Sequence, residues 1–337
     1  MSDEILKVEN LDVHFRSSAS IVKAVNGVNI SLKKKETLGI VGESGSGKSV
    51  TATALMRLLP KGIGSIPNGK ITFNGKDILS LSDKEMRDVR GNDIAMIFQD
   101  PMTSLNPVFT VGDQIEEAVR THQQISKKEA KLKAIEMLKV VGIPEPEKRV
   151  KMYPHEFSGG MRQRVMIAIA LSCNPKLLIA DEPTTALDVT VQAQILELMK
   201  SLQEKNDTSI IMITHDLGVV WEMCDKVIVM YAGNTVESGK VKTIYDNPLH
   251  PYTWGLLESQ ITKNTLNGNK LPAIPGSPPD LRNPIRGCNF ADRCPYAKEI
   301  CKTTKPEPIE VEEGHIVSCH FQTKSNRLER KELVYIE

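Results

Sequence analysis

The sequence predicts an α/β fold, because short apolar strands alternate with helical runs along the chain. Two runs contain the leucine and β-branched residues typical of strands buried in a parallel sheet: Leu177–Ala180 and Ile210–Thr214. Residues Thr37–Val41 form a further compact apolar strand that ends in glycines. Apolar residues recur at helical spacing in Ser126–Val141 and Arg162–Leu171. We therefore expect a mostly parallel core sheet accompanied by helices.

The N-terminal region predicts a second sheet, which is antiparallel. Between Ile5 and Leu38, apolar and polar residues alternate in short runs that are broken at residues 17–20 and 26–27. A helical subdomain is expected at about residues 102–157. Its helix at residues 126–141 places four apolar residues on one face, between lysines and glutamates. These residues are Ala130, Ala134, Met137 and Leu138.

The amino-acid composition of the chain changes near residue 259. Prolines at positions 272, 275, 278, 279 and 284 interrupt any regular element, and four cysteines follow. We expect residues 1–258 to form one nucleotide-binding domain. Residues 259–337 are expected to form a linker and a small appended domain.

Composition excludes several classes of protein. The 337 residues include 43 basic and 42 acidic side chains, and the net charge of +1 argues against a nucleic-acid binder held by bulk charge. The longest apolar runs fall below the roughly 18 residues that span a bilayer. The charged N-terminus does not resemble a signal peptide, so we expect a cytoplasmic protein without disulfides.

A glycine-rich segment between a predicted strand and a predicted helix matches the phosphate-binding pattern G-x-x-x-x-G-K-[ST]. In such a loop, backbone N–H groups converge on phosphate oxygens at a helix N-terminus. Lys48 would reach the β and γ phosphates of ATP, and the Ser49 hydroxyl would ligate Mg²⁺. The segment consists of Gly42, Glu43, Ser44, Gly45, Ser46, Gly47, Lys48 and Ser49.

Two adjacent carboxylates follow the apolar run at Leu177–Ala180. Neighbouring side chains leave a strand in different directions, so each carboxylate can have its own task. Asp181 is suited to the magnesium shell, and Glu182 is suited to orient or deprotonate the attacking water.

A second candidate for phosphate binding is the start of the helix near residue 158. Ser158 is a natural N-cap, and Gly159 and Gly160 leave the positive end of the helix dipole exposed. An ordinary capped helix explains the same residues equally well.

Six motifs occur in the order known from ABC ATPases: Walker A, Q-loop, signature, Walker B, D-loop and switch histidine. They lie at residues 42–49, Gln99, 157–163, 177–182, 185–188 and His215. The chain resembles this family over about residues 5–258. The resemblance implies a P-loop NTPase with a RecA-like core that hydrolyses ATP.

The resemblance also implies a shared ATP site. Ser158, Gly159 and Gly160 would act on the ATP held by an opposing subunit, and Asp188 would line the contact between subunits. The signature departs from the common LSGGQ at Phe157 and Met161. Because the serine and both glycines remain, the site is still expected to work.

Three further residues take roles only from the resemblance. Gln99 would sense magnesium and the attacking water, and His215 would steady the γ-phosphate. Phe15 would stack on adenine, although a core phenylalanine explains its position nearly as well.

Three stretches resemble the D-type ATPases of dipeptide and oligopeptide transporters: residues 99–107, 250–257 and 274–279. The resemblance implies a heterodimer with a second homologous ATPase, beneath two membrane permeases at the cytoplasmic face. An external binding protein would deliver the peptide. A nickel importer shares much of this pattern. A non-transport ABC ATPase and a redox-regulated cluster protein are weaker alternatives, since no second cassette, long coiled coil or electron-transfer motif is visible.

The C-terminal cysteines predict a metal or cluster site. Cys288, Cys294, Cys301 and Cys319 lie in a proline-rich segment with little hydrophobic core of its own. Four thiolates fit either tetrahedral zinc or an iron–sulfur cluster, and free thiols remain an option. The family resemblance favours a [4Fe–4S] cluster. His315 and His320 could replace a thiolate, although solvated surface histidines are the simpler expectation.

Overall fold

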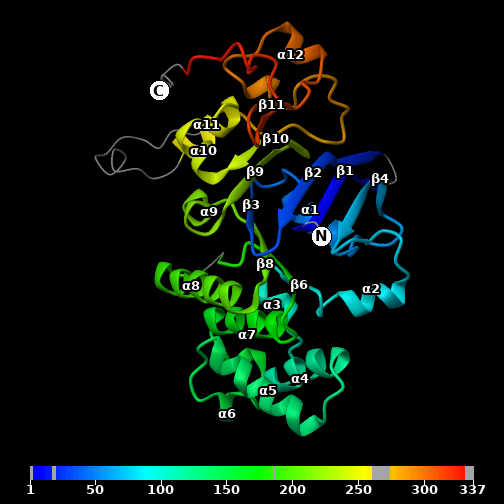
Figure 1. The fold of residues 1–337 in the computed structure, drawn as a ribbon, viewed down its shortest axis with the longest axis vertical. Coiled ribbons are helices and arrows are strands. Elements are labelled where there is room, and N and C mark those ends of the chain that lie inside the picture. Colours follow the sequence, from blue (N-terminus) through cyan, green and yellow to red (C-terminus); the bar gives the residue numbers. More distant parts are fainter. Residues whose placement is uncertain (1–2, 17–19, 185–186, 260–273, 331–337) are drawn as a thin grey trace. The chain divides into compact units, whose positions relative to one another are not determined.

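The computed structural model describes residues 3–16, 20–184, 187–259 and 274–330 (Figure 1). The chain forms two compact units. The first unit contains residues 1–6, 32–37 and 72–213, and the second contains residues 7–31, 38–71 and 214–337.

The first unit is built on parallel strands, as the sequence predicts. β7 (Leu177–Asp181) lies between β6 (Ile94–Ile97) and β8 (Ser209–Ile213), and both pairings are parallel. All residues of β7 and β8 are buried. This uniform burial explains why these strands are continuous apolar runs without alternation.

Helices make up most of the remainder of the first unit. In α5 (Lys127–Val140) the four buried residues are Ala130, Ala134, Met137 and Leu138, which confirms the predicted apolar face. A capping box between Ser126 and Glu129 fixes where α5 begins. The other helices are α2 (Asp83–Val89), α3 (Pro101–Ser104), α4 (Val111–His122), α6 (Pro146–Arg149), η1 (Pro154–Glu156), α7 (Gly159–Leu171) and α8 (Val189–Asn206).

A sheet in the order β2-β1-β4 lies mostly in the second unit. The strands are β1 (Glu4–Arg16), β2 (Ile21–Lys33) and β4 (Gly64–Phe73). The connection between β1 and β2 is too short for a parallel crossover, so this pair is antiparallel, as expected. The end of β4 pairs antiparallel with the short β5 (Lys76–Asp77) in the first unit.

The second unit also contains the strand that precedes the P-loop. β3 (Thr37–Val41) pairs in parallel with β9 (Lys226–Tyr231), and β9 pairs antiparallel with β10 (Asn234–Lys240). The sheet then continues through β12 (His315–Val317) to β11 (Ile309–Glu312). The helices are α1 (Lys48–Leu55), α9 (Leu217–Met223), α10 (Val241–Asp246), α11 (Pro251–Glu258), η3 (Ala291–Arg293) and α12 (Glu299–Thr303).

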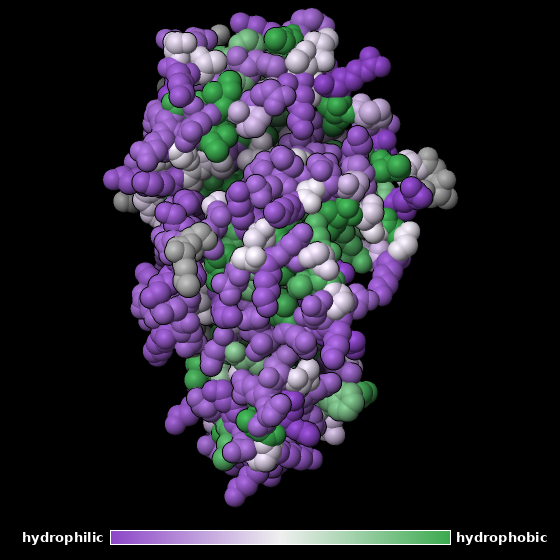
Figure 2. Space-filling view, turned by 45° about the vertical axis from the view of Figure 1, so that its right-hand side comes forward, coloured by the Kyte–Doolittle hydropathy of each residue, from purple (hydrophilic) through white to green (hydrophobic). Residues whose placement is uncertain are grey.

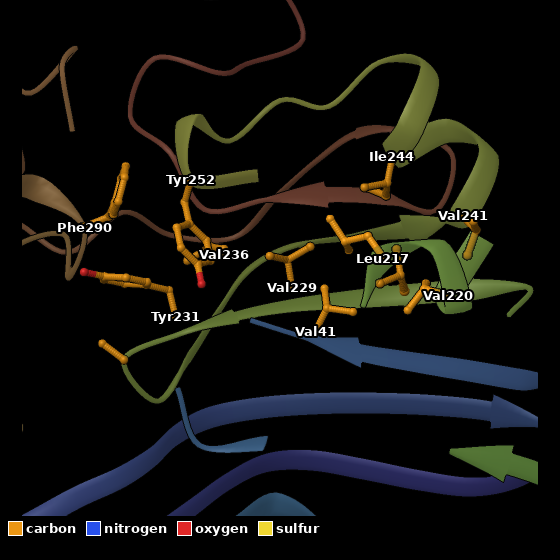
Figure 3. Close-up of a cluster of buried hydrophobic side chains, with 12 residues drawn as sticks. Val41, Leu217, Val220, Val229, Tyr231, Val236, Val241, Ile244, Tyr252 and Phe290 are labelled. Carbon is orange, nitrogen blue, oxygen red and sulfur yellow. The ribbon is translucent and has the colours of Figure 1, made fainter. Parts of the chain in front are cut away.

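The C-terminal residues therefore share their sheet with β10, which lies before the expected boundary at residue 258. They also share a core. Phe290 belongs to one buried cluster with Val229, Tyr231 and Tyr252 (Figure 3). The side chains of Cys288 and Cys294 pack against this cluster. The expectation that this segment has little core was incomplete, because it borrows the core of the preceding residues. The boundary itself stays a prediction.

The face shown in Figure 2 is covered mainly by hydrophilic residues, with hydrophobic ones scattered among them. None of the helices in the described ranges is long and apolar enough to cross a membrane.

Candidate nucleotide-binding site

The P-loop connects β3 to α1 in the second unit. β3 ends at Val41, and α1 begins at Lys48 with Gly47 as its N-cap. Gly42 has φ +150°, and a Cβ there would lie 2.1 Å from the carbonyl oxygen of Met230. Gly47 has φ +101°, and its Cβ would lie 2.6 Å from the oxygen of Ala24. Only glycine fits this backbone path, so the motif glycines are required by the local geometry.

Two polar side chains of the P-loop are suited to a phosphate. The buried Lys48 ammonium donates to the carbonyl oxygens of Gly42 at 2.7 Å and Glu43 at 3.0 Å. Within the part of the chain that the structure describes, the buried Ser46 hydroxyl has no hydrogen-bond partner. A phosphate would give both groups an anionic acceptor, so the residues present fit the expected ligand. Ser49 is half-buried in the first turn of α1, whereas Ser44 and Gly45 are exposed.

In the first unit, the structure brings together the residues predicted to handle the attacking water. The Gln99 amide donates to Glu182 Oε2 at 3.0 Å. Asp181 is the last residue of β7 and is buried. Glu182 follows with φ +47°, and its N–H donates to the oxygen of Ile213 at 2.8 Å. This turn lets the two adjacent carboxylates take different directions.

The signature residues begin α7 in the first unit. Ser158 is the N-cap, as predicted, and accepts from the Met161 N–H at 3.4 Å. A Cβ on Gly159 would meet open space, whereas a Cβ on Gly160 would lie 3.1 Å from Val191.

The structure explains the two departures from the common signature. Phe157 is buried, and the Arg149 guanidinium lies 5.9 Å from the centre of its ring. Arg149 also donates to the Met161 sulfur at 3.6 Å. Both substitutions therefore support the start of the helix from its inner side, and Ser158 and Gly159 stay exposed.

The remaining predicted residues lie in different elements of the two units. Asp188 is exposed at the N-cap of α8 in the first unit, while Thr185 and Ala186 lie outside the described residues. His215, in the second unit, is exposed after β8. Phe15 is half-buried, and its ring lies beside Gly64, where a Cβ would be 3.2 Å from Cε1.

The four C-terminal cysteines line one small cavity in the second unit, together with Phe290, His320 and Phe321. All six cysteines of the chain are free. Burial, with a smaller contribution from the charges of the neighbouring cysteines, raises the pKa of Cys294 to about 12 and that of Cys319 to about 11. The thiols are thus close enough to repel one another when ionised.

This arrangement does not match a mononuclear metal site. Among the described residues, no group of three or more His, Cys, Asp or Glu side chains has the geometry to hold a metal ion. The expectation of two solvated histidines was wrong for His315. It is 1% exposed, and its Nε2 lies 2.8 Å from the buried carboxylate of Glu237. His320 lines the cavity, and its Nε2 lies 2.9 Å from the oxygen of Thr304.

Sequence reasoning missed one contact to the P-loop. Glu43, a variable position of the motif, forms an ion pair with Arg293 at 2.6 Å. No spacing rule links residues 250 positions apart, so the sequence carries no local signal for this pair.

Comparison with known proteins agrees with this geometry. The family described as ABC transporter matches residues 25–185, and the C-terminal region of oligopeptide/dipeptide transporters matches residues 236–301. The oligopeptide transport ATP-binding protein OppD of Bacillus subtilis is 59% identical, over 93% of this chain and 87% of that protein. The dipeptide transport ATP-binding protein DppD of the same organism is 54% identical over 95% of both chains.

Solved structures give the same fold. The ATP-binding cassette MJ0796, in a dimeric post-hydrolysis state with ADP and phosphate, has a TM-score of 0.64 and 28% identity. The alignment covers 70% of this chain and 99% of that one. The cassette cbiO1 of Clostridium perfringens has a TM-score of 0.61 and 30% identity, over 73% of this chain and 92% of that one.

The P-loop on β3 and α1, with the cassette fold around it, defines an ABC ATPase, an enzyme that hydrolyses ATP. At this level of identity over nearly the whole chain, the protein belongs to the ATP-binding subunits of oligopeptide and dipeptide ABC importers. The nickel alternative is not favoured by these relatives.

Proposed function

We propose that this chain drives uptake of short peptides by binding ATP at residues 42–49 and hydrolysing it with Glu182 as the group that positions or deprotonates water. The observation that carries the proposal is the P-loop itself, where a buried lysine and a buried, unpaired Ser46 hydroxyl lie on a glycine path that no other residue fits. The Gln99–Glu182 hydrogen bond adds a positioned carboxylate.

Within this proposal, Ser49, Asp181 and Gln99 would hold Mg²⁺. The ion would neutralise charge on the phosphates during transfer. Gln99 orients the Glu182 carboxylate through its amide, so the base is held before the water arrives. His215 would contact the γ-phosphate, and Phe15 would stack on adenine.

We further propose that the working unit is a heterodimer with a second homologous ATPase, beneath two permeases at the cytoplasmic face of the membrane. An extracytoplasmic peptide-binding protein would supply the substrate. The exposed Ser158 and Gly159 at the start of α7 support a role toward an opposing subunit, as does the dimeric state of the similar cassette. Residues 1–258 would form the motor domain, with a helical part at about 102–157.

Reconstitution tests this proposal. The chain would be placed in proteoliposomes with its homologous ATPase, the permeases and the binding protein, and uptake of labelled peptide would be measured with and without ATP. We expect ATP-dependent peptide uptake, no nickel uptake and slow hydrolysis by the isolated chain. If the diluted isolated chain hydrolysed ATP as fast as the assembly, the shared site would be refuted.

We also propose that Cys288, Cys294, Cys301 and Cys319 hold a [4Fe–4S] cluster. The four thiols line one cavity, which supports a ligand that all four share. Anaerobically purified protein should contain iron and acid-labile sulfide. One equivalent of zinc would support the alternative, and four alkylatable thiols without metal would refute both.

A further inference from the structure

Two residues from later in the chain, Tyr252 of α11 and Arg293 of the C-terminal segment, hold the P-loop at Glu43. Arg293 donates to the Glu43 carboxylate through Nη1 at 2.6 Å and through Nη2 at 3.0 Å. The Tyr252 hydroxyl oxygen accepts from the Glu43 N–H at 2.8 Å. One P-loop residue thus has both its side chain and its backbone bound by residues that lie more than 200 positions later.

Arg293 is itself held in a single orientation. Its Nε donates to the oxygen of Pro275 at 2.9 Å, Nη2 donates to Ile274 at 3.1 Å, and Nη1 donates to the Tyr231 hydroxyl at 3.3 Å. With the two bonds to Glu43, all five guanidinium donors are used. The guanidinium also lies 5.7 Å from the ring centre of Tyr231. Because all its donors are bonded, the guanidinium cannot reorient freely. A displacement of the Arg293 backbone would therefore displace Glu43.

This ion pair is far more buried than the exposed pair in the same segment. The Arg293 side chain is 5% exposed and that of Glu43 is 27% exposed, whereas the pair of Arg282 and Asp280 in the same segment is 69% and 42% exposed. Exposed pairs contribute little, but removing one partner of a buried pair leaves a charge without compensation. The Arg293–Glu43 pair therefore constrains the P-loop.

The contacts at Glu43 also affect Lys48, the lysine expected to bind phosphate. The Lys48 ammonium donates to the carbonyl oxygens of Gly42 and Glu43, the residue that Arg293 and Tyr252 fix. A shift of Glu43 therefore changes the surroundings of the ammonium that is to bind phosphate.

Arg293 is also connected to the cysteines through the backbone. Arg293 directly precedes Cys294 and ends the short helix η3. Consecutive backbone hydrogen bonds join Ala291 to Cys288, Arg293 to Phe290 and Cys294 to Ala291. Cys288 donates its N–H to the oxygen of Cys301 at 2.7 Å. A rearrangement of the thiols would therefore move the backbone that carries Arg293.

We propose that Arg293 is a positioning residue of the nucleotide site, which fixes the P-loop through Glu43 and thereby couples the four-cysteine segment to nucleotide affinity. The inference rests on the proposed assignment of residues 42–49 as the nucleotide site. Coupling between two sites is reciprocal, so nucleotide binding also changes the cysteine segment.

Binding of a fluorescent ATP analogue to the full-length protein tests whether Arg293 sets nucleotide affinity. Arg293→Ala should weaken affinity between about 5-fold and 150-fold, the usual range of coupling between sites. Arg293→Lys should restore only part of it, because an ammonium cannot form the two-pronged contact. Glu43→Gln should weaken binding in the wild-type background but should not weaken it further in Arg293→Ala, where the contact is already lost. The matched control is Arg282→Ala, which should bind as the wild type does.

The Lys48→Ala variant distinguishes failure of the Arg293 coupling from failure of the assignment of residues 42–49 as the nucleotide site. If Lys48→Ala bound the analogue normally, the assignment of the nucleotide site would be wrong. If Lys48→Ala lost binding but Arg293→Ala kept the wild-type affinity, only the coupling would be overturned.

Hydrogen–deuterium exchange of the amides in residues 288–301 tests the reciprocal half, and a merely structural role of Arg293 would not produce the expected pattern. Addition of ATP with Mg²⁺, at a concentration that saturates each variant, should change exchange in this segment in the wild type and in Arg282→Ala, but not in Arg293→Ala. An equal response in Arg293→Ala, or no response in any variant, would overturn the coupling.

Discussion

Replacement of Glu182 by glutamine separates nucleotide binding from hydrolysis. The glutamine keeps an oxygen that can accept the hydrogen bond from Gln99, which is 3.0 Å long in the structure. The hydrogen bond loses its charge assistance, which costs about 1 kcal/mol of local stability. The ability to take a proton from water is lost, which raises the barrier by about 2.7–5.5 kcal/mol, a rate decrease of about 10²–10⁴.

The assay is ATP hydrolysis by the assembled complex, in which the P-loop lysine of the partner ATPase is replaced so that only one site turns over. We expect Glu182→Gln to bind ATP with unchanged affinity and to accumulate the closed dimer. Glu204→Gln removes an exposed carboxylate from the same unit and should hydrolyse normally. Hydrolysis by Glu182→Gln within about twofold of the wild-type rate would exclude Glu182 as the base.

Three further predictions concern the P-loop, the signature helix and the cysteines. Gly45→Ala should lower the unfolding free energy by about 1 kcal/mol, because alanine is strained at a φ of +78°. Gly47→Ala should lower it by about 1–3 kcal/mol more, because the added Cβ would meet the oxygen of Ala24. Chemical denaturation measures both losses. Ser158→Ala should lower the unfolding free energy by only about 0.5–1 kcal/mol, since its capping hydrogen bond is long at 3.4 Å. The same change should slow ATP hydrolysis by the assembled complex at least tenfold if the Ser158 hydroxyl binds a charged phosphate. Cys294→Ser should make residues 288–301 sensitive to protease while nucleotide affinity falls by less than in Arg293→Ala; unchanged proteolysis would argue against a bound cluster.

Elements specified by local pattern could be predicted from the sequence. The expected strand at residues 37–41 coincides with β3, and the four apolar positions of α5 are its four buried residues. Both follow from burial periodicity within one segment, which the chain shows directly. The N-cap at Ser158 was predictable for the same reason, because the capping bond joins residues three apart.

Features that depend on distant contacts could not be predicted. The pairing of β12 with β10 joins residues near 316 to residues near 238, and no pattern in either strand specifies the other. His315 has the appearance of a surface histidine until Glu237 is placed beside it. The departures at Phe157 and Met161 look like defects of a motif, and only the position of Arg149 shows that they support the helix.

Two of the stretches that resemble peptide-transporter ATPases also have a physical role in the structure. Residues 250–257 supply the Tyr252 hydroxyl, and residues 274–279 supply the carbonyl oxygens of Ile274 and Pro275 that orient Arg293. Tyr252 contacts Glu43 directly, and the oriented Arg293 pairs with its carboxylate. Glu43 occupies a motif position where the phosphate-binding pattern permits any residue. A glutamate there has no task in holding phosphate, and its charge is unfavourable beside one. Its presence is explained by the Arg293 guanidinium, which neutralises that charge and connects the P-loop to the cysteine segment.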